Sequence, residues 1–223
     1  MANNTHVYGF RWAQNYTGMA QPKPFEMAVA SGANFTVSGD ATNLNLNVGD
    51  PVKINTDGTV SLAGGNENSQ TSQPPWGVVV GMGYQGFFNG TRMVRQPFLQ
   101  SGCTYGTSVD RQSKVMVVPF SAGVWEIDVD DNATATTYLA YQVLIGENCD
   151  HRLIPNASGF LDANLAANPL LNIASHNPAT ATLSMRIVGI SQNLANQDYT
   201  GLFVKLLVSV NKGAEPYFTN VGT

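Results

Sequence analysis

Charged residues are scarce in this chain of 223 residues. They make up 12% of it, about half the roughly 25% typical of a soluble domain, and Asn, Thr, Ser, Gln and Gly take their place. The eleven Lys and Arg are scattered and the net charge is −4. Binding to nucleic acid depends on clustered basic side chains, so no nucleic-acid partner is expected. Scarce charge favours a surface partly covered by partners, although a neutral polar surface on a monomer gives the same composition.

Cysteines and long apolar runs are also few. Cys103 and Cys149 are too few for a disulfide scaffold, and we expect both to be thiols. The opening MANNTHVYGFRWAQNY lacks a basic stretch followed by an apolar one, so no secretory signal is predicted. No apolar run approaches the ~18 residues of a membrane-spanning helix. The chain is therefore expected to have no membrane partner.

Recognisable catalytic and metal-binding motifs are missing. None of His6, His151 and His176 lies in a metal-binding spacing, and no nucleotide-binding or nucleophile motif is present. Cys149 and His151 would share one face of a strand. That spacing suits half a metal site or a thiol–imidazole pair, but no second pair lies nearby unless Cys103 folds in, so we interpret it as a chance cluster.

The segment Asp128–Asn132 opens like a calcium-binding loop. Such a loop needs Gly at its sixth position and Glu at its twelfth, where this chain has Ala133 and Leu139. We therefore expect a solvated turn, with an improvised weak ion site as the alternative. No catalytic residue, cofactor or metal ligand is assigned from the sequence.

The pattern that is present is that of short strands. Strand candidates recur about every ten to fifteen residues with turn residues between them, and no amphipathic helix longer than about ten residues appears. This spacing predicts an all-β fold, a barrel or sandwich of short antiparallel strands. The continuous valines of 77–82 favour burial on both faces. The candidates are 24–31, 44–54, 59–64, 77–82, 91–100, 114–120, 124–130, 182–190 and 202–210.

Turn residues predict how several of these strands are joined. Asp57-Gly58 predicts a hairpin with a type I′ turn, in which both central residues have positive φ. Asn89-Gly90 predicts a second hairpin. Pro51 has no N–H to donate, so it should open its strand or lie at a sheet edge.

The segments 114–120 and 124–130 are predicted to pair with each other through a short connection. In the second segment Glu126, Asp128 and Asp130 alternate with apolar residues. Acids on one face of a strand indicate a face in contact with water.

Two segments are harder to assign. Residues 132–150 fit either a helical turn or a strand. Residues 151–180 are rich in Asn, Ala and Pro, and Pro155, Pro169 and Pro178 would break a long helix, so this region is predicted to be irregular.

The chain is divided into an extended N-terminal arm (1–23), a single β-rich domain (24–212) and a C-terminal tail (213–223). The arm carries too many aromatic side chains for a disordered tail, and their spacing is too irregular for a helix. We expect it to pack either on its own domain or on a neighbouring molecule.

The order of short motifs along the chain resembles that of the tailed-phage capsid cement, or head decoration, proteins. These motifs are an arm MAN…GF, a GDPV turn, a GVVVG strand and a late pair RIVGI…VKLLVSVN. The resemblance implies a non-catalytic virion protein, made in the host cytoplasm, that binds the outer surface of the major capsid protein shell and stabilises it. It also implies self-association, with a homotrimer favoured and a dimer as the alternative.

Aromatic residues and Arg are the usual anchors of protein interfaces. We therefore predict docking through the arm and the tail, although the same rings would equally cap the chain's own barrel. The predicted partner-binding residues are Tyr8, Phe10, Arg11, Trp12, Tyr217 and Phe218.

Two other functions fit the same composition. One is a structural component of a phage tail or neck. The other is a carbohydrate-binding β-sandwich module, in which Trp12, Trp76 and Trp125 would line a groove and stack on sugars.

Overall fold

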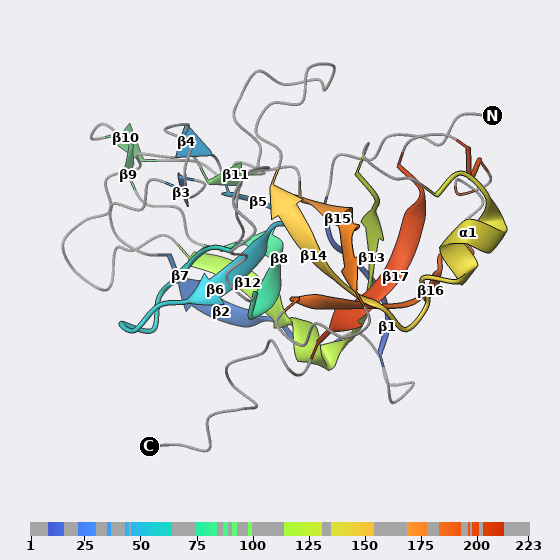
Figure 1. The fold of residues 1–223 in the computed structure, drawn as a ribbon. Helices are drawn as coiled ribbons and strands as arrows, with labels where there is room; N and C mark the ends of the chain where they lie inside the picture. Colours follow the sequence, from blue (N-terminus) through green and yellow to red (C-terminus); the bar gives the residue numbers. More distant parts are fainter. Residues whose placement is uncertain are drawn as a thin grey trace.

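The fold is built from short antiparallel strands, as the sequence predicts (Figure 1). Within the described residues there are seventeen strands and one short α-helix, and no helix is long and apolar enough to cross a membrane. The computed structural model describes residues 9–15, 22–29, 35–36, 43–44, 46–63, 75–83, 87–88, 91–92, 98–99, 114–130, 135–153, 169–177, 183–192, 196, 198–200 and 203–211.

The larger sheet has six strands in the order β1-β13-β17-β16-β14-β15. It combines the N-terminal strand with strands from the second half of the chain (Figure 1). Its members are β1 (Arg11–Asn15), β13 (Gly123–Asp128), β17 (Lys205–Val210), β16 (Met185–Ile190), β14 (Asn148–Leu153) and β15 (Pro169–Asn177).

The smaller sheet has five strands in the order β2-β12-β8-β6-β7. Its members are β2 (Phe25–Ala28), β12 (Lys114–Pro119), β8 (Gly77–Met82), β6 (Pro51–Ile54) and β7 (Val60–Leu62). Three two-stranded ladders join β3 (Phe35–Thr36) to β4 (Asn43–Leu44), β5 (Leu46–Asn47) to β11 (Phe98–Leu99), and β9 (Phe87–Phe88) to β10 (Thr91–Arg92).

Both sheets curl back on themselves. An isolated parallel bridge joins Val29, just after β2, to Val60 in β7, and so connects the two edges of the smaller sheet. A second bridge joins Val129, just after β13, to Leu171 in β15. Strands twist in one direction, and a curled sheet encloses its apolar face.

Each curled sheet therefore has its own hydrophobic core. Val79 and Val117 point into the core of the smaller sheet, whereas their neighbours Val78 and Val118 belong to the core of the larger one. This alternation follows from the period of two along a strand. The smaller sheet thus fills its own interior with one face and packs against the second core with the other.

The segments 114–120 and 124–130 form strands, as predicted, but they do not pair with each other. β12 pairs with β2 and β8, whereas β13 pairs with β1 and β17. The chain crosses between the sheets through a 3₁₀ turn, Phe120–Ala122, and Phe120 is fully buried there. Its carbonyl accepts a hydrogen bond of 3.3 Å from the indole N–H of Trp125. The buried Phe120 ring thus fixes a crossing between the two sheets at the position where the sequence predicts a hairpin.

The hairpin predicted at Asp57-Gly58 is confirmed, but the predicted type I′ turn is wrong. β6 pairs with β7, and Asn55 N–H donates to the Thr59 carbonyl at 2.8 Å, so three residues form the loop. Gly58 has a φ of 78°, whereas Asp57 is not among the described positive-φ residues. The Asp57 carboxylate instead accepts hydrogen bonds from the backbone and hydroxyl of Thr59. Such a three-residue loop places a glycine at its left-handed position.

Two other turn predictions are confirmed. Pro51 opens β6, and β9 pairs with β10 across the Asn89-Gly90 position, although those two loop residues lie outside the described ones. The prediction for 77–82 is wrong in one respect. Val80 is 38% exposed, so β8 is buried on both faces only at its start.

The two segments that resisted assignment are resolved in part. Residues 138–142 form helix α1 (Tyr138–Gln142), and the Thr137 hydroxyl caps it by accepting from Ala140 N–H at 3.2 Å. The prediction that 151–180 is irregular is wrong for 151–153, which end β14, and for 169–177, which form β15. Pro169 breaks helices, but it is well tolerated as the first residue of a strand.

Candidate functional site

The N-terminal strand β1 lies beside β13 in the larger sheet, next to a cluster of buried charges. β1 pairs with β13, with Arg11 opposite Glu126 and Trp12 opposite Trp125. Just before it, Phe10 is 2% exposed and its N–H donates to the Gly49 carbonyl at 2.9 Å. Residues 9–15 of the predicted arm therefore pack on the chain's own body.

The acids of β13 are buried, contrary to the prediction of a water-facing strand. Glu126, Asp128 and Asp130 are at most 9% exposed. The acids do alternate with apolar residues in the sequence. Their cationic partners come from other strands, which the local sequence pattern does not reveal. Buried carboxylates persist in proteins when such partners surround them.

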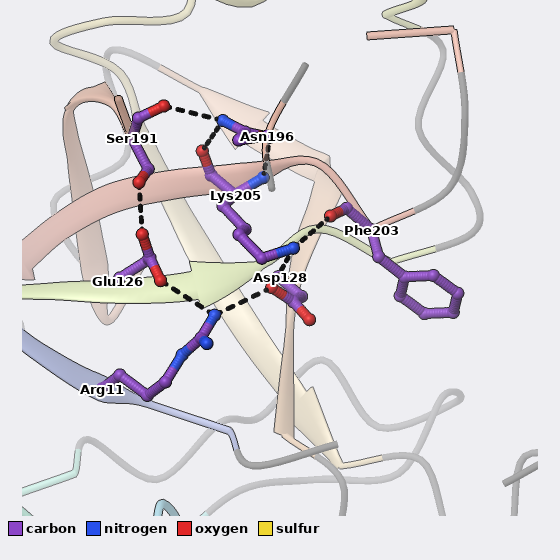
Figure 2. Close-up of polar contacts among 7 residues, drawn as sticks. All are labelled: Arg11, Glu126, Asp128, Ser191, Asn196, Phe203 and Lys205. Atoms are coloured by element: carbon purple, nitrogen blue, oxygen red, sulfur yellow. Dashed lines mark hydrogen bonds and ion pairs between the residues drawn. The ribbon is translucent and has the colours of Figure 1, made fainter. Parts of the chain in front are cut away.

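Two cations approach Asp128 from different strands (Figure 2). The Arg11 Nη2 atom lies 2.8 Å from Glu126 Oε1 and 3.5 Å from Asp128 Oδ1. Lys205, on β17, is fully buried, and its Nζ lies 3.6 Å from the same Oδ1 atom. We call these four residues, Arg11, Glu126, Asp128 and Lys205, the ionic cluster.

A second layer of hydrogen bonds holds the ionic cluster in place. The Ser191 hydroxyl donates to Glu126 Oε2. The Asn196 side-chain amide donates to the carbonyls of Ser191 and Lys205, each at 2.9 Å, and its oxygen accepts from Lys205 N–H at 2.8 Å (Figure 2). Asn196 therefore joins the end of β16 to the start of β17, and the Lys205 backbone is fixed.

Burial controls the electrostatics of Asp128. Burial raises the pKa of its carboxyl to about 6, while Lys205 and Arg11 lower it and Glu126 raises it further. Both carboxyl oxygens are buried without a hydrogen bond of ordinary geometry, and the two cations stand at ion-pair rather than hydrogen-bond distance. The ionised form of Asp128 is thus only partly compensated.

A neighbouring ion pair lies just beyond the same end of β13. Arg152 Nε approaches Asp130 Oδ2 at 2.9 Å, and both side chains are buried. Burial, together with Asp130, raises the pKa of Tyr141 to about 12. With Asp128 and Asp130 each facing a cation, these two carboxylates do not fit a calcium site; Asp131 and Asn132 lie outside the described residues.

Cys149 and His151 do not form a reactive pair. His151 Nε2 contacts the Ala63 carbonyl at 3.0 Å, which makes it the N–H donor, and Nδ1 accepts from the Ser184 hydroxyl at 3.1 Å. Burial lowers the pKa of His151 and raises that of the Cys149 thiol. Cys149 is a free thiol, and Cys103 lies outside the described residues.

Across the described part of the chain no group of three His, Cys, Asp or Glu residues is placed to hold a metal.

The predicted docking residues of the arm turn mostly inward. Phe10 packs edge-on against Phe120, with ring centroids 4.8 Å apart, so its ring offers no surface to a partner in this structure. Arg11 belongs to the ionic cluster, and half-buried Trp12 stacks edge-on against Trp125 at 5.2 Å. Phe10 is therefore corrected from a docking residue to a core residue. Tyr8, Tyr217 and Phe218 lie outside the described residues.

The same packing bears on the carbohydrate-binding alternative. Trp125 is fully buried in the core of the larger sheet, so it cannot line an open groove with Trp12 and Trp76. Sugar stacking needs exposed aromatic faces.

An exposed apolar surface lies on and beside α1, and the sequence did not reveal it. Leu139 and Val143, one helical turn apart, are each 67% exposed. The turn after the helix is tied to β16 by a hydrogen bond of 2.8 Å from Gly146 N–H to the Ile187 carbonyl. We call these residues the α1 surface: Tyr138, Leu139, Val143, Ile145 and Val188. The i, i+4 spacing of Leu139 and Val143 is the one sequence signal that could have indicated this surface.

Comparisons of the chain with family models, with curated proteins and with solved structures give no match.

Proposed function

We propose that this protein is a capsid decoration protein that binds the outside of a tailed-phage shell and stabilises it without catalysing a reaction. The order of motifs along the chain supports this assignment, as does a composition poor in charge. A protein that covers much of its surface with partners needs less charge to stay soluble.

The observation that carries the proposal is the α1 surface. Its side chains are the large apolar groups that interfaces bury, and they come from helix α1, the turn that follows it and the neighbouring strand β16. Clusters of exposed apolar side chains on a soluble domain mark sites of interaction. Thr137 caps helix α1 and the turn after the helix is hydrogen-bonded to β16, so the surface is presented on a fixed support.

The proposed mechanism is bracing by several weak contacts at once. A homotrimer, or a dimer, presents two or three copies of the α1 surface to neighbouring major capsid subunits. Once one copy is bound, the next binds at a high effective concentration, so modest contacts add up to stable decoration. The ionic cluster is assigned a structural role in this scheme, because it fixes β1 to β13.

The test is binding of the purified protein to expanded capsid shells that do not already carry it. A double variant, Leu139→Ser with Val143→Ser, removes the centre of the α1 surface without touching either core. We expect it to cosediment with shells at least tenfold more weakly than the wild type, because central apolar anchors carry most of an interface's energy.

The matched control is Val80→Ser, a partly exposed valine on the smaller sheet, away from α1. It should bind like the wild type. Equal binding of the wild type and the double variant would rule out the α1 surface as the docking face. Binding confined to the vertex that carries the tail, with no decoration of the lattice, would reassign the protein to the tail or neck.

A further inference from the structure

Lys205 and Asp128 face each other directly across two central strands. The register of β13 and β17 places them in cross-strand positions, and side chains so placed share one face of the sheet. Lys205 is fully buried and Asp128 is 3% exposed. The amine nitrogen and a carboxyl oxygen stand 3.6 Å apart in the interior of the protein.

Keeping Lys205 and Asp128 charged in the interior costs free energy. Neither Asp128 oxygen has a hydrogen bond of ordinary geometry, and charge out of water is unfavourable unless closely compensated. Two opposite charges in such surroundings gain from any reaction that leaves both groups neutral. Water release from an amine and a carboxylic acid is one such reaction, and it needs no oxidant, reductant or cofactor.

We propose that the Lys205 amine and the Asp128 carboxyl condense into an intramolecular isopeptide bond that links β13 to β17. The proposal does not rest on capsid binding. It assigns a covalent modification site to a residue pair that otherwise has only a structural role.

The step balances in atoms and charge. The Lys205 ammonium gives one proton to the Asp128 carboxylate, which leaves a neutral amine and a neutral carboxylic acid. The nitrogen lone pair attacks Cγ and a C–N bond forms, with negative charge developing on Oδ1. A second proton moves from nitrogen to the other oxygen, the C–O bond breaks, and one water leaves. The product is a neutral amide that keeps one N–H.

Two neighbouring groups suit this reaction. The Arg11 guanidinium lies 3.5 Å from Oδ1, the oxygen on which charge develops, so it is placed to stabilise the oxyanion. The Phe203 carbonyl accepts from Lys205 Nζ at 3.4 Å and holds the amine beside Asp128 (Figure 2). Phe203 has a φ of 62°, a conformation that a bulky residue adopts only when its surroundings impose it.

Burial favours the required protonation of Asp128. The pKa of its carboxyl is raised to about 6, so the neutral acid is populated near neutral pH. The fixed cross-strand placement supplies the high effective concentration that a slow bimolecular condensation lacks in water.

The experiment is the intact mass of the purified, fully denatured full-length protein, followed by peptide mapping. We expect a mass lower than that of the sequence by one water, and a branched peptide that joins the segments containing Asp128 and Lys205. Trypsin should fail to cleave after Lys205. Lys205→Arg keeps the positive charge but cannot form this amide, so it should have its full sequence mass with an unchanged circular dichroism spectrum.

Asp128→Ala provides a second variant that cannot react, in case the arginine does not fit. A wild-type protein with its full mass after prolonged incubation at pH about 6, and ordinary tryptic cleavage after Lys205, would overturn the proposal. Loss of water without the branched peptide would do the same, because it would place the dehydration elsewhere.

Discussion

Removing the Phe10 ring tests most sharply whether the N-terminal segment is part of the body of the protein. Phe10→Ala deletes a side chain that is 2% exposed and packs edge-on against Phe120 and His151, with centroids 4.8 and 5.9 Å away. Truncating a buried Phe to Ala costs about 3–5 kcal/mol, from lost apolar burial and the cavity left behind. The flanking Gly9 is closely packed as well, because a Cβ there would lie 2.4 Å from the Pro169 side chain.

The assay is urea denaturation followed by circular dichroism. A loss of about 4 kcal/mol is a large fraction of the 5–15 kcal/mol that holds a typical domain together, so the unfolding midpoint should fall by about 1–2 M. The matched control is Phe25→Ala, because the Phe25 side chain is 57% exposed. That variant should lose less than about 1 kcal/mol. Equal losses for the two variants would refute the placement of Phe10 in the core.

Three further variants probe the interior. Burial raises the pKa of Asp50 from 3.8 to about 8, so the native state holds a proton that the unfolded state has lost, and stability falls as pH rises from about 4 to about 8. Asp50→Asn cannot ionise, and its urea midpoint should fall less between these two pH values. Arg11→Gln should cost about 1–3 kcal/mol by leaving the buried Glu126 carboxylate without its cation, whereas Lys114→Gln, from an exposed pair, should cost less than about 1 kcal/mol in the same assay. Gly77→Ala should lower the thermal midpoint by several degrees, because its Cβ would lie 2.6 Å from the Val118 carbonyl, while Gly81→Ala, with 3.6 Å to its nearest neighbour, should change it little.

Local patterns in the sequence predict the strands well. Continuous valines and alternating residues locate β8, β12, β16 and β17 within a few residues. Such strands are set by side-chain period and by the turn residues that bound them, both of which are local properties. In the GVVVG motif close packing accounts for Gly77, because a Cβ there would lie 2.6 Å from the Val118 carbonyl of β12.

Pairing between distant segments escaped prediction. The strand β1 joins a sheet made otherwise from the second half of the chain, and nothing within residues 11–15 identifies β13 as its partner. For this reason the acids of β13 were expected to face water, when Arg11 and Lys205 cover them from neighbouring strands. The residues of the ionic cluster are also far apart in the sequence, with Arg11 and Lys205 near opposite ends of the chain.

The docking prediction is wrong at Phe10 for a related reason. Large aromatic residues in an N-terminal arm fit either an interface or the chain's own core, and composition does not distinguish the two. The structure places Phe10 in the core and leaves aliphatic side chains, Leu139 and Val143, on the surface. Whether a residue is exposed depends on which other elements of the tertiary fold cover it, and a local sequence pattern does not specify those elements.

Decoration can be observed directly in a density map of expanded capsid shells incubated with the purified protein. We expect added density on the outer surface, repeated across the capsid lattice at local symmetry axes, with α1 facing the major capsid protein. Shells whose outer surface is unchanged at saturating protein would contradict this expectation.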